Sequence, residues 1–229
     1  MEKSLLAIGA HYDDCVFGVP GILLQAVRKH YRVVILSLIG DYSNWTPIGD
    51  RHQDLLHGTV EISRDYGVEM RYLEFKSHVF DVNAQTKTAV AQAVAEIQPD
   101  MAFYLWRHDH HDDHVVASQL SAIALRYASP LLENRPVRGP RQQYMYDNGP
   151  RHTIRFEPDT FVDVTDVWPA AVDWLGRFMA LVRDEPYDPK RRDGAQQLKE
   201  TIAAYRGKTC GVQYAEALRA VDAYPRDIL

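Results

Sequence analysis

The first 130 residues alternate apolar runs with amphipathic stretches, and this alternation constrains the fold more than any other feature of the chain. Short continuous apolar runs are typical of buried strands, whereas apolar residues spaced three or four positions apart indicate helices. Strands that alternate with helices predict a mostly parallel, Rossmann-like α/β sheet with right-handed crossovers and helices on both faces. The expected strands are residues 5–10, 32–39, 69–75 and 101–106, and the expected helices are 16–30, 50–66, 86–97 and 115–127.

Beyond residue 130 the pattern is less regular, because prolines and glycines interrupt it. Short strands are expected at 143–146 and 160–164, followed by helices at 167–182 and 194–205. With 229 residues, of which 46% are hydrophobic, the chain is long enough to bury one substantial core. We therefore interpret residues 1–229 as a single domain, with a core α/β sheet in 1–130 and a C-terminal α/β extension in 131–229.

The charge balance argues against nucleic-acid partners, because a formal net charge of -5 provides no basic field for a phosphate backbone. The two cysteines, Cys15 and Cys210, imply no disulfide framework and fit a reducing compartment. No apolar stretch approaches the roughly 18 residues of a membrane span, and the N-terminus lacks the pattern of a signal peptide. We therefore expect a cytoplasmic protein with no membrane partner. Whether it forms a homo-oligomer is left open.

Two groups of histidines and aspartates directly follow expected strands. His11, Asp13 and Asp14 come after the strand at 5–10, and the run HDHHDDH at 108–114 comes after the strand at 101–106. In the commonest doubly wound order the first and fourth strands are neighbours, so their C-terminal loops meet at one edge of the sheet. Imidazole and carboxylate together are ligands that zinc selects. Such residues also occur in solvated loops, but two groups at one edge favour a metal site.

A nucleotide-binding domain is a competing interpretation of the same fold class. The turn after the first expected strand lacks the sequence G-x-G-x-x-G, and no Walker-type lysine follows its glycines. A phosphate-cradling loop is therefore not expected.

The segments that carry these groups resemble two signatures of the PIG-L/LmbE-like N-deacetylases. AIGAHYDDCVFG is similar to the family's AHPDDE-type motif, and HDDHVVAS is similar to its HPDH motif, which a helix follows. Two later segments, FEPDTFVDVTDVW and YRGKTCGVQYAEAL, resemble the family's late strand-and-turn and its C-terminal RG-x-x-x-G-x-x-YAE pattern. The resemblance covers nearly the whole chain. It implies zinc-dependent removal of the N-acetyl group from an N-acetylglucosamine-like amino sugar or a conjugate of one.

The resemblance also implies a role for each residue of the two signatures. Asp13 would act as the general base, and His111 as the acid or the oxyanion partner. Asp113 would orient His111 or a neighbouring histidine. Three protein ligands leave a coordination position for water, as catalytic zinc sites do. Those ligands would be His11, Asp14 and His114, holding Zn2+ or another divalent ion.

Asp41 and Arg51 are candidates for substrate binding. Asp41 lies in the loop after the second expected strand and could bind a sugar hydroxyl, although a plain turn aspartate fits equally well. Arg51 could reach the substrate, but a solvated helix start fits its position better.

Three positions depart from the family's signatures. Tyr12 and Asp112 stand where proline is usual, and Cys15 replaces a glutamate that would support a metal ligand from behind. We interpret Cys15 as a small buried hydrophobe in preference to a zinc ligand. These departures leave two alternatives open, an amidase acting on another N-acyl substrate and a metal-binding protein of the same fold that has lost turnover.

Overall fold

The computed structural model describes residues 3–225, which form a seven-stranded sheet in the order β3-β2-β1-β4-β5-β7-β6. The five strands from β3 to β5 are parallel, and β7 is antiparallel to both β5 and β6. This confirms the expected fold class. The strands are β1 (Ser4–Gly9), β2 (Arg32–Asp41), β3 (Val68–Lys76), β4 (Met101–Leu105), β5 (Gln142–Tyr146), β6 (Thr160–Asp163) and β7 (Ala215–Ala220).

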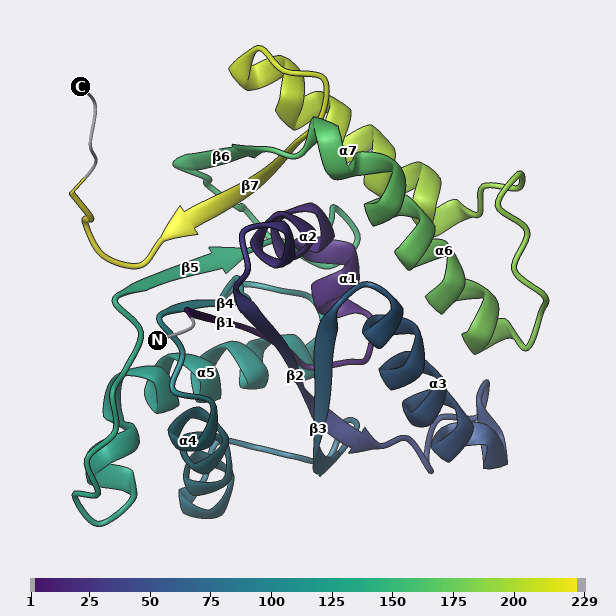
Figure 1. Cartoon of the computed structure of the whole chain (residues 1–229). Coiled ribbons are helices and arrows are strands. Elements are labelled where there is room, and N and C mark those ends of the chain that lie inside the picture. The colour runs from purple at the N-terminus through teal and green to yellow at the C-terminus, as the bar shows by residue number, and fades with distance from the viewer. Residues whose placement is uncertain (1–2, 226–229) are drawn as a thin grey trace.

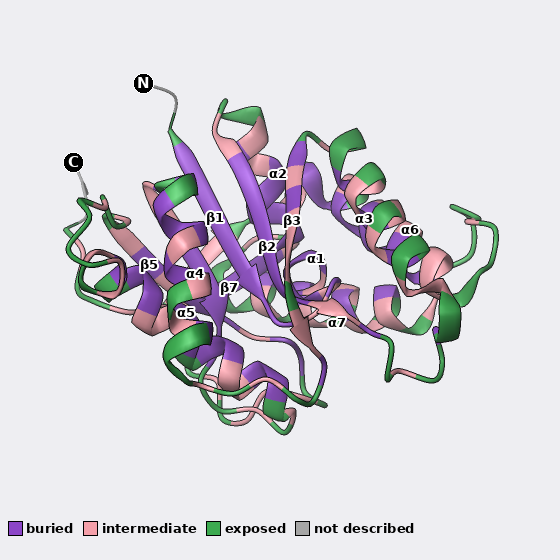
Figure 2. Ribbon diagram, turned by 90° about the horizontal axis from the view of Figure 1, so that it is seen from below, coloured by how far each residue is buried: buried purple, intermediate pink, exposed green. Residues whose placement is uncertain are grey.

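Helices cover both faces of the sheet. Figure 1 shows α4 and α5 on one face and α2, α3 and α6 on the other, with α7 packed against α6 and β7. Every residue of β1 is buried, and the central strands form the core between the helical layers (Figure 2). The helices are α1 (Asp14–Gly18), α2 (Pro20–Arg28), α3 (His52–Asp65), α4 (Ala84–Ile97), α5 (Asp112–Leu131), α6 (Trp168–Arg183) and α7 (Gly194–Cys210), with short 3-10 helices at Gly49–Arg51 and Thr165–Val167.

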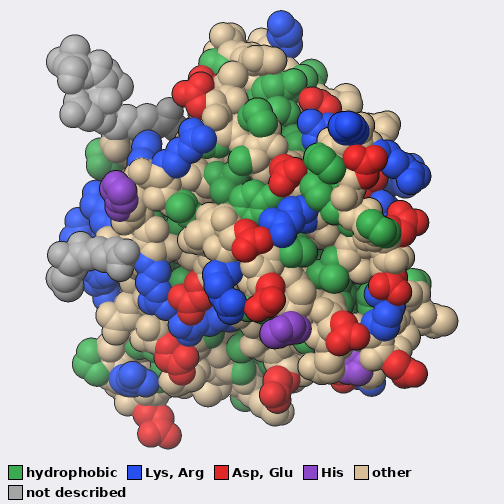
Figure 3. All heavy atoms as spheres, turned by 45° about the vertical axis from the view of Figure 1, so that its right-hand side comes forward, with side chains coloured by type: hydrophobic (Ala, Val, Ile, Leu, Met, Phe, Trp, Pro, Cys, Tyr) green, Lys and Arg blue, Asp and Glu red, His purple; other side chains and the backbone are tan. Residues whose placement is uncertain are grey.

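The surface mixes charges, and acidic and basic side chains are interspersed over the face seen in Figure 3. None of the helices in the described part of the chain combines the length and the apolar character that crossing a bilayer requires.

The single helix expected at 16–30 is interrupted and forms α1 and α2. Val19, between them, has φ -136 and ψ 33, outside the helical region. Pro20 explains the break, because proline has no N–H and disfavours helical backbone in the residue before it. As a consequence α1 is a short helix that begins at Asp14, directly at the edge of the sheet.

No strand was expected where β7 lies. Alanine and glutamate, which make up most of its sequence AEALRA, are depleted in strands, so their propensity gave no signal. Its first four residues are nevertheless buried, because β7 fills the place between β5 and β6.

A buried ion pair ties β7 and α7 to the segment that carries the first signature. Glu216 of β7 and Lys199 of α7 approach within 3.1 Å, with side chains that are 0% and 5% exposed. The Glu216 carboxylate also accepts hydrogen bonds from the backbone N–H groups of Gly21 (3.0 Å) and Ile22 (2.8 Å) at the start of α2. Lys199 donates to the carbonyl oxygen of Gly18 at 2.8 Å. The YAE pattern of the sequence therefore anchors the α1–α2 junction.

Replacing Glu216 with alanine should destabilise the protein by about 3–5 kcal/mol, because the Lys199 ammonium stays buried without its counter-charge. Urea unfolding followed by circular dichroism measures the change. The matched control is Asp222→Ala, which removes one partner of the exposed pair Arg126–Asp222. An exposed pair contributes about 0–1 kcal/mol. Equal losses in the two variants would contradict an anchoring role for Glu216.

Candidate metal and catalytic site

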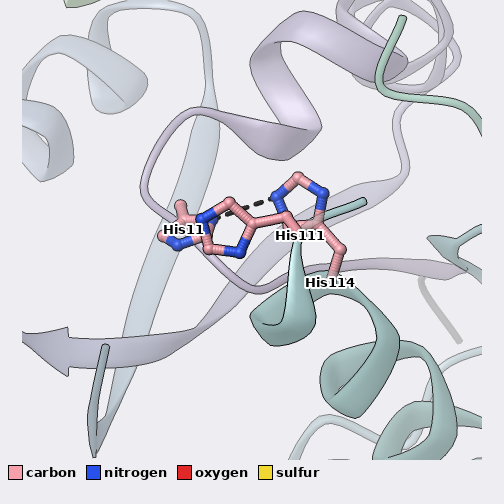
Figure 4. A group of neighbouring side chains, drawn as sticks. All are labelled: His11, His111 and His114. Atoms are coloured by element: carbon pink, nitrogen blue, oxygen red, sulfur yellow. Dashed lines mark hydrogen bonds between the residues drawn. The ribbon is translucent and has the colours of Figure 1, made fainter. Parts of the chain in front are cut away.

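The two signatures meet because β1 and β4 are adjacent parallel strands. His11 lies in the loop after β1 and Asp14 begins α1, while His111 and His114 lie at the start of α5, after β4. Figure 4 shows the ring of His11 facing those of His111 and His114. The sheet order thus brings together residues that are about a hundred positions apart in the chain, as the strand pattern predicted.

The side chains of three residues, His11, Asp14 and His114, form a small triangle of potential ligands. Nδ1 of His11 and Nε2 of His114 are 3.1 Å apart, and Asp14 places Oδ1 3.2 Å from Nε2 of His114 and Oδ2 3.6 Å from Nδ1 of His11. Ligands about 2.0–2.2 Å from a tetrahedral zinc ion are separated by about 3.3 Å. The spacing and the donor chemistry of these residues therefore fit zinc.

A carboxylate stands behind each histidine of the triangle. Nε2 of His11 lies 3.2 Å from Oδ2 of Asp113, and Nδ1 of His114 lies 3.1 Å from Oδ2 of Asp109. The first contact is a hydrogen bond, whereas the second is close but not aligned as one. Carboxylates in such positions fix which ring nitrogen faces a metal and increase its basicity.

The Asp113 carboxylate contacts the ring of His11, from across the site. The sequence predicts that it orients His111 or a neighbouring histidine. The hydroxyl of Ser77 (3.0 Å) and the N–H of His78 (2.9 Å) also donate to this carboxylate. Towards His111, only the backbone N–H of Asp113 makes a hydrogen bond, donating to Nδ1 at 3.3 Å.

Asp14 is held ionised in a buried position. It accepts hydrogen bonds from the N–H groups of Ala10 and His11, both at 2.8 Å, and from the side-chain amide of Asn148. Burial favours the neutral acid, but the His114 and His11 rings outweigh burial and hold the pKa of Asp14 well below its usual range. The approach is so close that a Cβ on residue 9 would lie 2.8 Å from Cβ of Asp14, which explains the glycine there.

The carboxylates around His11 and His114 make the site favourable for a cation. Burial lowers the pKa of His114, but Asp14 and Asp109 outweigh burial and raise it to about 10. Burial also lowers the pKa of His11, and there Asp113 and Asp14 raise it to about 9. Both shifts show the same surplus of negative charge around the two rings. A divalent cation would compensate that charge.

Asp13 differs from its neighbour Asp14 in both contacts and charge. It is partly buried, precedes α1 and makes no capping hydrogen bond. Burial, followed by the charge of Asp14, raises the pKa of Asp13 to about 6. A carboxylate with a pKa near neutral pH is suited to accept a proton.

His111 faces the same cavity in a neutral form. Burial, and then the His11 and His114 rings, lower its pKa to about 4. Because its Nδ1 accepts the hydrogen bond from the Asp113 N–H, the proton of the neutral ring is assigned to Nε2. His111 can therefore donate a hydrogen bond without being charged.

A cavity of about 600 Å³ opens above the triangle. Besides the residues already described, Tyr42 and Trp45 after β2 and Ala195 and Leu198 of α7 line it. The volume and the aromatic side chains suit a small organic substrate.

Neither Asp41 nor Arg51 is among the described residues that line this cavity. Asp41 accepts from the Ser43 N–H and pairs with Lys76, and Arg51 donates to the Val182 carbonyl oxygen. Their role in substrate binding stays a prediction that these contacts do not favour.

Two of the departures from the signatures have local explanations. The backbone N–H of Tyr12 donates to the Tyr42 hydroxyl at 3.0 Å, a hydrogen bond that proline could not make. Cys15 is buried with its sulfur 3.3 Å from the Tyr146 hydroxyl, and burial raises the pKa of its thiol. Cys15 thus behaves as a neutral buried side chain beneath the site.

Asp109 and Asn148 are site residues that sequence reasoning missed. Asp109 lies in a run of only histidine and aspartate, where spacing alone could not single it out. Asn148 follows β5, and no sequence pattern pointed to it. Only the fold brings both of them to the ligands.

The variant Asp109→Asn should weaken metal binding about 10–100-fold, the usual cost of losing a carboxylate behind a ligand histidine. Asparagine keeps an oxygen that can accept from the His111 N–H, as Oδ1 of Asp109 does at 2.8 Å, while the charge beside His114 is lost. A competition titration with a chromophoric chelator measures the affinity. Asp112→Asn, at the exposed first residue of α5, is the matched control and should bind as the wild type does. An unchanged affinity in Asp109→Asn would remove Asp109 from the site.

Residues 6–125 match the family described as PIG-L, GlcNAc-PI de-N-acetylase. The chain belongs to the PIG-L family of deacetylases. A curated relative, the uncharacterized deacetylase YaiS of Escherichia coli K12, is 22% identical over 134 residues, which are 57% of this chain and 72% of the relative.

Solved structures resemble this member of the PIG-L family over nearly its whole length. The N,N'-diacetylchitobiose deacetylase of Pyrococcus horikoshii has a TM-score of 0.75 at 19% identity, covering 96% of this chain and 84% of its own. The 4-carboxy-2-hydroxymuconate hydratase GalB of Pseudomonas putida KT2440 has a TM-score of 0.80 at 18% identity, covering 99% of each chain. At these identities the likeness shows the fold alone. A deacetylase and a hydratase share that fold, so the reaction has to be argued from the site.

Proposed function

We propose that this protein is a zinc-dependent N-deacetylase that hydrolyses the N-acetyl group of an N-acetylglucosamine-like amino sugar or its conjugate. The observation that carries the proposal is the triangle of His11, Asp14 and His114, with a carboxylate behind each histidine and a cavity above. A bound zinc ion would polarise the amide carbonyl and acidify a water molecule. Membership of a deacetylase family supports the reaction class.

In this proposal Asp13 is the general base. Its raised pKa places it near the protonation equilibrium at neutral pH, and its carboxylate lines the cavity beside the ligands. It would take a proton from the attacking water as the new C–O bond forms, which separates its task from that of Asp14.

His111 is the proposed oxyanion partner. Its Nε2–H would donate to the carbonyl oxygen as negative charge develops there. When the C–N bond breaks, the leaving amine takes up the proton that the water gave to Asp13, and acetate is released. Tyr42 and Trp45 offer aromatic surfaces on which a sugar ring can lie.

The deciding experiment measures metal content and amine release together. Purified protein is analysed for zinc, iron, cobalt and nickel, because a set of two histidines and one aspartate accepts several divalent ions. N-acetylglucosamine, its conjugates and unrelated N-acyl amides are then assayed with and without a chelator. We expect chelator-sensitive release of amine and acetate from N-acetyl sugars. Turnover of only other N-acyl amides would favour the amidase, and bound metal without any turnover would favour the impaired metal-binding protein.

Replacing His111 with serine should lower kcat about 10²–10³-fold with little change in KM, because the lost hydrogen bond forms mainly in the transition state. Serine retains an oxygen that can cap α5 in place of Nδ1 and is too short to reach the substrate. His108→Ser and His110→Ser, in the same run, are the controls and should retain nearly full kcat. A larger loss at His110 than at His111 would show that the wrong histidine has been assigned.

A further inference from the structure

We propose a second, weaker divalent-metal site beside the first, formed by His78, His111 and Asp113. Each of these residues offers a ligand atom, and the three atoms lie within 4.8 Å of one another. Two imidazoles and a carboxylate are a donor set for zinc and related ions, with water completing the coordination. This site goes beyond the proposed deacetylase reaction, which does not use His78.

The backbone of His78 is held in an uncommon conformation that places it at the site. Its φ of 61 lies in the left-handed region, where few residues other than glycine are found. The His78 N–H donates to both carboxylate oxygens of Asp113, at 2.9 and 3.1 Å, and these bonds hold the turn after β3. The ring stacks on that of His111, with centroids 5.0 Å apart and an angle of 15°. The side chain is 62% exposed, so an ion can approach from solvent.

Each of the three residues has an atom that can still bind a metal. Nδ1 of His78 is 3.9 Å from the Asp113 carboxylate, beyond hydrogen-bond distance. Oδ2 of Asp113 is occupied by Ser77 and His11, whereas Oδ1 accepts only from the His78 N–H among the described contacts. Nδ1 of His111 accepts from the Asp113 N–H, so Nε2 is the nitrogen that can bind a metal, once the ring proton has moved to Nδ1.

The site should be weaker than the triangle of His11, Asp14 and His114. The stacked His78 ring must rotate before one of its nitrogens can bind an ion shared with His111 and Asp113. Fixing this exposed side chain in one rotamer costs conformational entropy. For Nε2 of the neutral His111 ring to bind an ion, the ring proton must move to Nδ1, and the hydrogen bond from the Asp113 N–H is then lost. Occupation removes the donor that the proposed deacetylation uses. Excess metal should therefore inhibit, an expectation that rests on the proposed function.

A different cluster, Asp109, His114 and His152, also places three ligand atoms within 4.8 Å. There the nitrogen that faces Asp109 is Nδ1 of His114, while Nε2 faces the triangle. Filling both sites would require His114 to bridge two ions as an imidazolate, with neither ring nitrogen protonated. The group that contains His78 makes no such demand, because it shares no ring with the triangle.

The test counts metal ions in the wild type and in His78→Gly. Glycine accepts the positive φ and keeps the N–H that binds Asp113, so the variant removes only the imidazole. Protein stripped of metal is dialysed against rising concentrations of Zn2+, and bound zinc is measured by elemental analysis. We expect one tight and one weaker equivalent in the wild type, and the tight one alone in His78→Gly. The matched control is His152→Ala, which should bind both.

Three results would overturn the proposal: a single equivalent in the wild type at every zinc concentration, a second equivalent that survives in His78→Gly, or its loss in His152→Ala instead. The count does not depend on finding a substrate, so an inactive wild type would refute the proposed function and leave this test intact. With an active enzyme, inhibition by excess zinc should disappear in His78→Gly.

Discussion

Replacing His114 with alanine is expected to abolish tight metal binding and, with it, hydrolysis. Nε2 of His114 lies 3.1 Å from His11 and 3.2 Å from Asp14, so its removal opens the triangle at its most buried corner. Loss of a carboxylate behind a ligand costs about 10–100-fold in affinity, and loss of the ligand itself should cost more than about 100-fold. Elemental analysis after dialysis, together with a competition titration, measures both stoichiometry and affinity.

His110→Ala is the matched control for this variant, since it removes a histidine of the same run that is not assigned to the triangle. Circular dichroism establishes that both variants are folded. A full equivalent of tightly bound metal in His114→Ala would mean that the ligand assignment is wrong.

The pair Asp13→Asn and Asp14→Asn should separate base from ligand. Asp13→Asn is expected to keep a full equivalent of metal while kcat falls about 10²–10⁴-fold, the usual contribution of a general base. Because the Asp13 side chain makes no capping hydrogen bond, this change should leave α1 intact. Asp14→Asn should lose the metal, because an amide is a poor substitute for a buried carboxylate that contacts both histidines. Metal content and kcat are measured on the same samples, and the opposite pattern of metal loss would exchange the two roles.

The parts of the molecule that were predictable from sequence are those in which local pattern and topology agree. The apolar runs at 5–10 and 101–106 identified β1 and β4, and the usual strand order made them neighbours. Charged residues directly after both runs could then meet only at one edge of the sheet. Strand order therefore predicted that the two groups meet, whereas the choice of His11, Asp14 and His114 within them came from the resemblance to the family's signatures.

The remaining features depend on contacts that no local pattern encodes. Asn148 reaches Asp14 across 134 positions, and Asp113 supports His11 across 102. The strand β7 has the composition of a helix and is a strand only because β5 and β6 flank it. Asp41 and Arg51 were predicted from their positions in the sequence alone. In the structure Asp41 pairs with Lys76 and Arg51 donates to the Val182 carbonyl oxygen, both outside the cavity.

The position of β7 also has a consequence for how the molecule assembles. Glu216 and Gly21 are 195 positions apart, so the junction behind Asp14 gains its anchor only when almost the whole chain is present. Chains whose decisive contacts are so distant in sequence fold slowly, since a large loop must close before those contacts form. During synthesis at the ribosome, β4 would have an unpaired edge until β5 has been made. Such an edge can form hydrogen bonds with the wrong strand or with another chain. Metal binding should therefore be among the last properties that a newly made chain acquires.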